Sequence, residues 1–170
     1  NRTRTPQPAD ATTPTFRNIA WNNLSIDGTD QVDMVDGLPE RLLEGISIDQ
    51  VTVRGAARGI SVTLVDGLSL TDWTLAVAKG PALQVAQSRA LHLSAIQVRH
   101  PPPDSAVISL TDIDGAYVRS CHAADGTGVF LQVSGPASKG IVLQSNQLVA
   151  AAKPTALADG ASLEALTILP

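Results

Sequence analysis

The chain has 170 residues, which suits one domain with a sizeable core, and aromatic residues make up only 3% of it. Its formal net charge of −4 gives it no long-range attraction for nucleic acid. No apolar run is long enough to span a membrane, so we expect neither nucleic acid nor a membrane as a partner. The single cysteine, Cys121, excludes an internal disulfide.

Residues 1–15 contain three prolines and several threonines without apolar periodicity, which predicts an extended N-terminal arm. Because the chain begins at Asn1 without an initiator methionine, we expect a processed or truncated piece of a longer protein. Residues 16–170 form one repeat domain in this interpretation.

One apolar pattern recurs along residues 16–170 at intervals of 22 to 27 residues. The first apolar positions of its copies are Ile19, Ile46, Leu68, Leu91, Ala116, Ile141 and Leu166. A nearly constant period of this length is typical of a stacked repeat protein. Apolar and polar residues alternate within each copy, which indicates strands and not helices. The sequence therefore predicts an all-β fold, a right-handed parallel β-helix of about six to seven coils with three short strands per coil.

The predicted strands follow one another in a fixed order along each coil. The inward residues of the first and second strands are Ile19/Trp21 with Leu24/Ile26, Ile46/Ile48 with Val51/Val53, Leu68/Leu70 with Trp73/Leu75, Leu91/Leu93 with Ile96/Val98, Ala116/Val118 with Cys121/Ala123, and Ile141/Leu143 with Asn146/Leu148. The third strands are predicted around Val32, Ile60, Leu83, Ile108 and Val129. Neighbouring coils should lie about 4.8 Å apart.

A charged residue stands two places before the first strand of every copy. The column reads Arg17, Glu44, Asp66, Arg89, Asp114, Lys139 and Glu164. Most neighbours in it carry opposite charges, which predicts ion pairs that fix the register between coils. The glycine that follows in four copies (Gly45, Gly67, Gly115 and Gly140) predicts a tight turn with positive φ.

The loops after the second strands hold a local excess of positive charge. Its members are Arg54, Arg58, Lys79, Arg99 and His100. Stacked loops at one edge of a solenoid form a groove that could hold an anionic polymer such as a uronate chain. The alternative is that these are solvated charges that keep the edge soluble.

The residues that catalysis needs are largely missing. His92 and His122 are predicted on the outer face, and no histidine has ligands at metal-binding spacing, so we expect no metal and no cofactor. Asp112 and Asp114, with Asp125 nearby, could form a glycosidase pair. Aspartates followed by glycine, as at Asp114 and Asp125, are however ordinary turn formers, and we favour turns over catalysis. Cys121 is predicted as a buried thiol, beneath an Asn146 that hydrogen-bonds the backbone at a coil corner.

Several segments in the first half of the chain suggest a family. Residues 13–19 (TPTFRNI), 23–26 (NLSI), 37–40 (GLPE), 45–48 (GISI) and 80–83 (GPAL) resemble the C-terminal third of polygalacturonase-like glycoside hydrolases of family 28. The resemblance implies a right-handed parallel β-helix, pectic galacturonans as substrates, and an extracellular or periplasmic location. The catalytic motifs of that family, Asn-x-Asp, Asp-Asp, Gly-His-Gly and Arg-x-Lys, do not occur here. No catalytic residue is carried over, and we expect the chain by itself to lack hydrolase activity.

Three functional hypotheses remain open. The chain is the trailing coils of a pectinase-like hydrolase, or a stand-alone module that binds acidic polysaccharide, or a structural protein that self-associates. The last hypothesis rests on the sequence ending in mid-coil, at 165–170 (ALTILP), without an amphipathic capping helix at either end. Uncovered solenoid ends present unpaired backbone groups that favour stacking between molecules.

Overall fold

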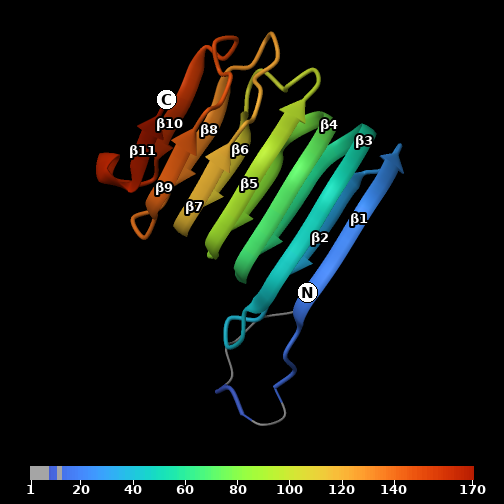
Figure 1. Cartoon of the computed structure of the whole chain (residues 1–170), viewed down its shortest axis with the longest axis vertical. Coiled ribbons are helices and arrows are strands. Elements are labelled where there is room, and N and C mark those ends of the chain that lie inside the picture. Colours follow the sequence, from blue (N-terminus) through green and yellow to red (C-terminus); the bar gives the residue numbers. More distant parts are fainter. Residues whose placement is uncertain (1–7, 11–12) are drawn as a thin grey trace.

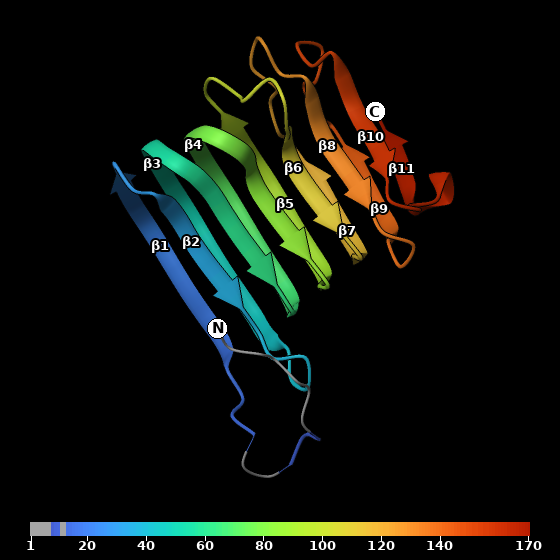
Figure 2. The same ribbon diagram turned by 180° about the vertical axis from the view of Figure 1, so that it is seen from behind.

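The computed structural model describes residues 8–10 and 13–170, and it is a right-handed parallel β-solenoid of about six turns (Figures 1 and 2). The predicted fold class is therefore confirmed. The strands are β1 (Arg17–Asp27), β2 (Gln31–Asp36), β3 (Leu43–Thr63), β4 (Val65–Ala86), β5 (Arg89–Val98), β6 (Ala106–Thr111), β7 (Asp114–Arg119), β8 (Val129–Ser134), β9 (Lys139–Gln144), β10 (Lys153–Ala158) and β11 (Leu166–Leu169). A 3-10 turn, Leu163–Ala165, precedes β11. All of the named strands pair in parallel.

The long strands β3 and β4 each continue around the corners of a coil, so each of them includes more than one of the predicted short strands. The first corner is marked by a residue with positive φ in each coil: Asn23, Gln50, Asp72, Ala95, Ser120 and Ser145. The strand registers place these residues above one another. A residue whose backbone adopts this left-handed conformation turns the chain sharply. The corner divides each run into a first and a second strand, and the third strand follows on the next side.

The predicted inward columns are the hydrophobic core. Ile46 pairs with Leu68, and Leu68 pairs with Leu91, so these three side chains lie in successive rungs. Each is at most 3% exposed. Burial of such aliphatic columns is the main stabilising term, at about 25 cal/mol for each Å² of apolar surface removed from water.

The two ends of the stack depart from this burial. Trp21 occupies the same inward column as Ile48, yet it is 40% exposed because no described strand pairs with the outer edge of β1. At the other end Ile168 continues the column of Leu143 and is 61% exposed. Inward position alone therefore does not bury a side chain; it also needs a coil on each side.

The charged column pairs as predicted in the middle of the stack. Arg89 Nη2 lies 2.7 Å from Asp66 Oδ2, and Lys139 Nζ lies 3.2 Å from Asp114 Oδ2. The hydrogen bond and charge of Asp66 raise the pKa of Arg89. The turn after the column also has the predicted geometry, since Gly45 has a φ of +63°. These exposed pairs contribute little to stability, but a shift of register would lose them.

Thr13 and Thr15 lie at the entrance to the first coil. The Arg41 guanidinium, from the loop that joins β2 to β3, donates a hydrogen bond of 3.2 Å to the carbonyl oxygen of Thr13 and another to the Thr15 hydroxyl. Most of the predicted arm, residues 1–15, falls outside the described residues, and its extended form stays a prediction.

Cys121 and Asn146 form the internal corner that the sequence predicted. Asn146 Oδ1 accepts a hydrogen bond of 2.9 Å from the Cys121 amide, and Asn146 Nδ2 donates one of 2.9 Å to the Val118 carbonyl. The Cys121 thiol is buried, and its burial raises its pKa to about 11. Both predictions for this corner are confirmed: a buried thiol and an amide that is hydrogen-bonded to the backbone.

The raised pKa of Cys121 predicts a loss of stability at alkaline pH. The unfolded chain releases the thiol proton near its ordinary pKa of 9.0, whereas the folded chain holds it up to about 11. The free energy of unfolding should therefore be unaffected below pH 9 and should fall by up to about 2.7 kcal/mol as the pH rises to 11. Urea unfolding at several pH values tests this, with Cys121→Ala as the control. If the variant declines as steeply as the parent between pH 9 and 11, another group is responsible.

Candidate functional site

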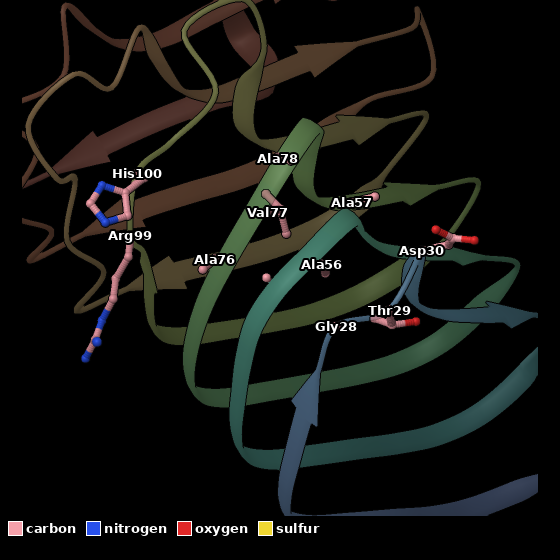
Figure 3. A pocket seen from close by; sticks show the side chains of 11 residues that line it. Gly28, Thr29, Asp30, Ala56, Ala57, Ala76, Val77, Ala78, Arg99 and His100 are labelled. Carbon is pink, nitrogen blue, oxygen red and sulfur yellow. The ribbon is translucent and has the colours of Figure 1, made fainter.

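A cleft of about 490 Å³ lies at the corner between the second and third strands of the first coils. Residues from four successive coils form it. Its lining residues are Gly28, Thr29, Asp30, Gly55, Ala56, Ala57, Ala76, Val77, Ala78, Arg99 and His100. Most of these side chains are very small, so the polypeptide backbone comes close to the surface of the cleft. Figure 3 shows the small residues between a cationic side and a side formed by Thr29 and Asp30.

Arg99 and His100 form the cationic side of the cleft. They follow β5, and both side chains are exposed. His100 has a positive φ of 56°, which turns the chain at the start of the loop that contains Pro101–Pro103. The two residues are neighbours in sequence and lie on the same side of the cleft (Figure 3). Arg99 and His100, which the sequence analysis grouped together, therefore lie together in the structure.

Arg58 and Lys79 lie one above the other beside the cleft. They are partners in the parallel register of β3 and β4, and both are exposed. Each directly follows a lining residue, Ala57 or Ala78. Adjacent rungs are about 4.8 Å apart, so two positive charges are held close together on this edge. Neither has an ion pair among the described residues.

Arg54 is placed differently from the other predicted cations. Its Nη1 lies 3.4 Å from Asp27 Oδ2, so an acidic partner from the preceding coil balances its charge. Arg54 also lines a separate polar hollow of about 380 Å³ on the second-strand side, together with Gln50, Thr52 and Asp72. Of the five predicted cations, only Arg99 and His100 line the cleft. Arg58 and Lys79 directly follow lining residues, and Arg54 lies outside the cleft.

The acidic residues considered for catalysis act as turn and pairing residues. Asp114 pairs with Lys139, as described above. Asp112 has a positive φ of 52°, and its Oδ1 accepts a hydrogen bond of 3.3 Å from the Ala137 amide. Across the described residues, no group of three or more His, Cys, Asp or Glu side chains is arranged to hold a metal ion.

Sequence reasoning missed an aromatic pair on the outer face of the first strands. The rings of His92 and Tyr117 are stacked with their centroids 6.0 Å apart and an interplanar angle of 17°. The two residues are register partners in β5 and β7. The Tyr117 hydroxyl is hydrogen-bonded to Gln144 Oε1 in the next coil. Their 25-residue separation, equal to the repeat period, was the signal that could have revealed them.

The fold and these surfaces define a β-solenoid repeat protein with a corner cleft that has Arg99 and His100 on one side and Asp30 on the other. Comparison with family models, curated proteins and solved structures finds no match to the chain. Within residues 8–10 and 13–170, none of the helical structure is long and apolar enough to cross a membrane.

Proposed function

We propose that this chain is a non-catalytic stack of coils that binds acidic polysaccharide at its cationic corner, as the trailing part of a secreted pectinase-type hydrolase. The proposal rests on Arg99 and His100, which line the corner cleft, and on the stacked pair Arg58 and Lys79, which directly follow lining residues in the two preceding coils. This positive edge stands out on a chain of net charge −4. The link to a hydrolase, and the extracellular or periplasmic location, rest on the sequence resemblance alone.

The shape of the cleft suits an extended polymer lying across several coils. Small residues such as Ala57 and Ala78 let a sugar ring approach the backbone closely. A uronate carboxylate is a planar acceptor that a guanidinium binds with two parallel hydrogen bonds. Arg58 and Arg99 can supply such bonds, while Lys79 adds charge and His100 can donate a hydrogen bond. The lining contains no Trp, Tyr or Phe on which a sugar ring could stack, so we expect charge to carry most of the affinity.

A titration with polygalacturonate at low ionic strength tests the proposal. We expect binding that weakens as salt is added, because exposed charges are screened over about 10 Å at 0.1 M salt. The double variant Arg58→Ala with Arg99→Ala should weaken it about tenfold, at roughly 0.7 kcal/mol for each exposed cation. Arg54→Ala is the matched control, since that arginine is paired with Asp27 outside the cleft.

Three results would contradict the proposal. The first is no binding at low ionic strength. The second is equal binding to a neutral polymer such as dextran, since charge would then not select the ligand. The third concerns activity: the chain should release no reducing ends from polygalacturonate, and release that depends on this chain would show it to be catalytic.

A further inference from the structure

The polar hollow that Arg54 lines is a second feature of the surface, separate from the corner cleft. It has a volume of about 380 Å³ and lies on the outer face of the second strands of β1, β3 and β4, which lie side by side in Figure 1. It shares no lining residue with the corner cleft. Six polar residues line it in two columns: Asn23, Gln50 and Asp72 at the corner, and Ser25, Thr52 and Thr74 on the strands.

The strand column presents its hydroxyl groups outward. Val51 and Val53 are each 1% exposed, so alternation turns Thr52, which lies between them, away from the core. Thr52 pairs in register with Ser25 in the preceding coil and with Thr74 in the next coil. The three hydroxyl-bearing residues therefore follow one another at about 4.8 Å. Thr52 and Thr74 are partly buried, and β-branching restricts their χ1 angles, so their hydroxyls are well placed before any ligand arrives.

The fold itself does not use the six polar side chains of the hollow. Within residues 8–10 and 13–170, none of the six makes a side-chain hydrogen bond or an ion pair. Comparable groups on the outer face of the first strands bond to one another. There, Ser47 Oγ donates a hydrogen bond of 3.1 Å to Asp49 Oδ2, and the Tyr117 hydroxyl bonds Gln144. The donors and acceptors of the hollow are therefore available to a ligand.

The charges and residue types of the hollow indicate the class of ligand. Arg54 is engaged by Asp27, which leaves the Asp72 carboxylate as the unpaired charge of the lining and disfavours a polyanion. Hydroxyl and amide side chains both donate and accept hydrogen bonds, as each hydroxyl of an uncharged sugar does. Leu24 is the one apolar residue in the lining, so a ligand that must bury apolar surface gains little here.

We propose that this hollow binds the uncharged sugar residues of a polysaccharide. Sugar hydroxyls donate hydrogen bonds to the Asp72 carboxylate and exchange them with the hydroxyls of Thr52 and Thr74. The volume lies within the range of about 300–1,000 Å³ that is usual for small-ligand sites. Because these hydrogen bonds replace bonds to water, we expect a dissociation constant of about 1 mM. The inference does not depend on the proposed function, since the hollow and the corner cleft favour ligands of different charge.

Amide NMR spectra of the nitrogen-15-labelled chain test this site, with neutral tetrasaccharides of galactose, arabinose and glucose as probes. At least one probe should cause saturable shifts at residues 50–54 and 72–74 while the cleft residues Ala57 and Ala78 stay unchanged. Tetragalacturonate should not shift the residues of the hollow. The inference is overturned if no probe causes saturable shifts at concentrations up to about 10 mM, or if the shifts fall elsewhere on the surface. A failure of tetragalacturonate to bind the cleft would count against the proposed function alone.

A pair of threonine substitutions identifies the hydroxyls that contact the sugar. Thr52→Val with Thr74→Val keeps the β-branched shape and the strand preference but removes two hydroxyls. Each lost hydrogen bond should weaken binding roughly fivefold, so the double variant should raise the dissociation constant roughly 25-fold. Thr111→Val is the matched control: Thr111 is partly buried in β6, lines neither the hollow nor the cleft, and should be replaceable without effect on binding. A double variant that is folded by its NMR spectrum and binds like the parent would refute the site.

Discussion

Replacing Trp73 by alanine is expected to lower the free energy of unfolding by about 3–5 kcal/mol. Trp73 is the largest fully buried side chain, at 2% exposure, and it lies in an inward column between Val51 and Ile96. Its Nε1 donates a hydrogen bond of 2.8 Å to the carbonyl oxygen of Ile48 in the preceding coil. Truncation therefore opens a cavity and breaks a link between coils at the same time.

The position of Trp73 within the stack increases this effect. The stability of a solenoid is approximately the sum of the stabilities of its repeats and of the contacts between neighbours. Trp73 is in β4, which pairs with β3 on one side and with β5 on the other, so its loss weakens two junctions. Trp73→Phe should cost less, because it keeps most of the ring volume and loses mainly the hydrogen bond, worth about 1–2 kcal/mol.

Trp21 provides the matched control because the chain has only two tryptophans. Trp21→Ala should cost less than half as much as Trp73→Ala, since the Trp21 side chain is 40% exposed in the folded chain. Urea unfolding followed by far-ultraviolet dichroism at low protein concentration measures both. Equal losses for the two variants would show that the middle of the stack is packed no more tightly than its end.

The core was predictable from the sequence because two periods coincide. Alternation assigns Ile46 and Ile48 to one face of a strand, and the repeat interval assigns Leu68 and Leu70 to the same face of the next. Hydrophobic burial needs nothing more specific than this. The exposure of Trp21 was not predicted, because the pattern of a terminal coil is the same as that of an internal one.

The corners and the cleft were less visible in the sequence, for a physical reason. Gln50, Asp72 and Ala95 all adopt positive φ at the same corner, although they share no side-chain chemistry. The surrounding strands impose this backbone conformation, so the residue types at the corner do not predict it. The floor of the cleft is formed mainly by alanines and glycines. These residue types do not indicate a binding site in the sequence, and the cleft is seen only once the coils are stacked.

The pairing of Arg54 shows where sequence reasoning stopped short. The register that aligns Ile26 with Val53 also aligns Asp27 with Arg54. The partner was therefore available from the same repeat that predicted the core. The sequence analysis counted only the positive residues in these loops and so overlooked Asp27. Because Asp27 pairs with Arg54, the cationic surface is smaller than the sequence suggested.

Asn146→Ala is expected to destabilise the fold by about 2–6 kcal/mol, although it removes only a small polar group. The Asn146 amide satisfies the Cys121 N–H and the Val118 carbonyl, each at 2.9 Å. An alanine leaves both backbone groups without this partner beside the core, and each buried unsatisfied group costs about 1–3 kcal/mol. The Cys121 amide is the more demanding of the two, because an N–H has one bond to make and a carbonyl has two lone pairs.

A comparison of two further variants separates hydrogen bonding from packing at this corner. Asn146→Asp keeps the acceptor for the Cys121 amide but places a carboxylate against the Val118 carbonyl, so it should be destabilised near neutral pH. Protonation of Asp at lower pH restores a donor, and the difference from the parent should then narrow. Gln147→Ala, an exposed neighbour, should change the free energy of unfolding by no more than about 0.5 kcal/mol. Urea unfolding at two pH values measures all three, and an Asn146→Ala variant as stable as Gln147→Ala would show that water replaces the amide without cost.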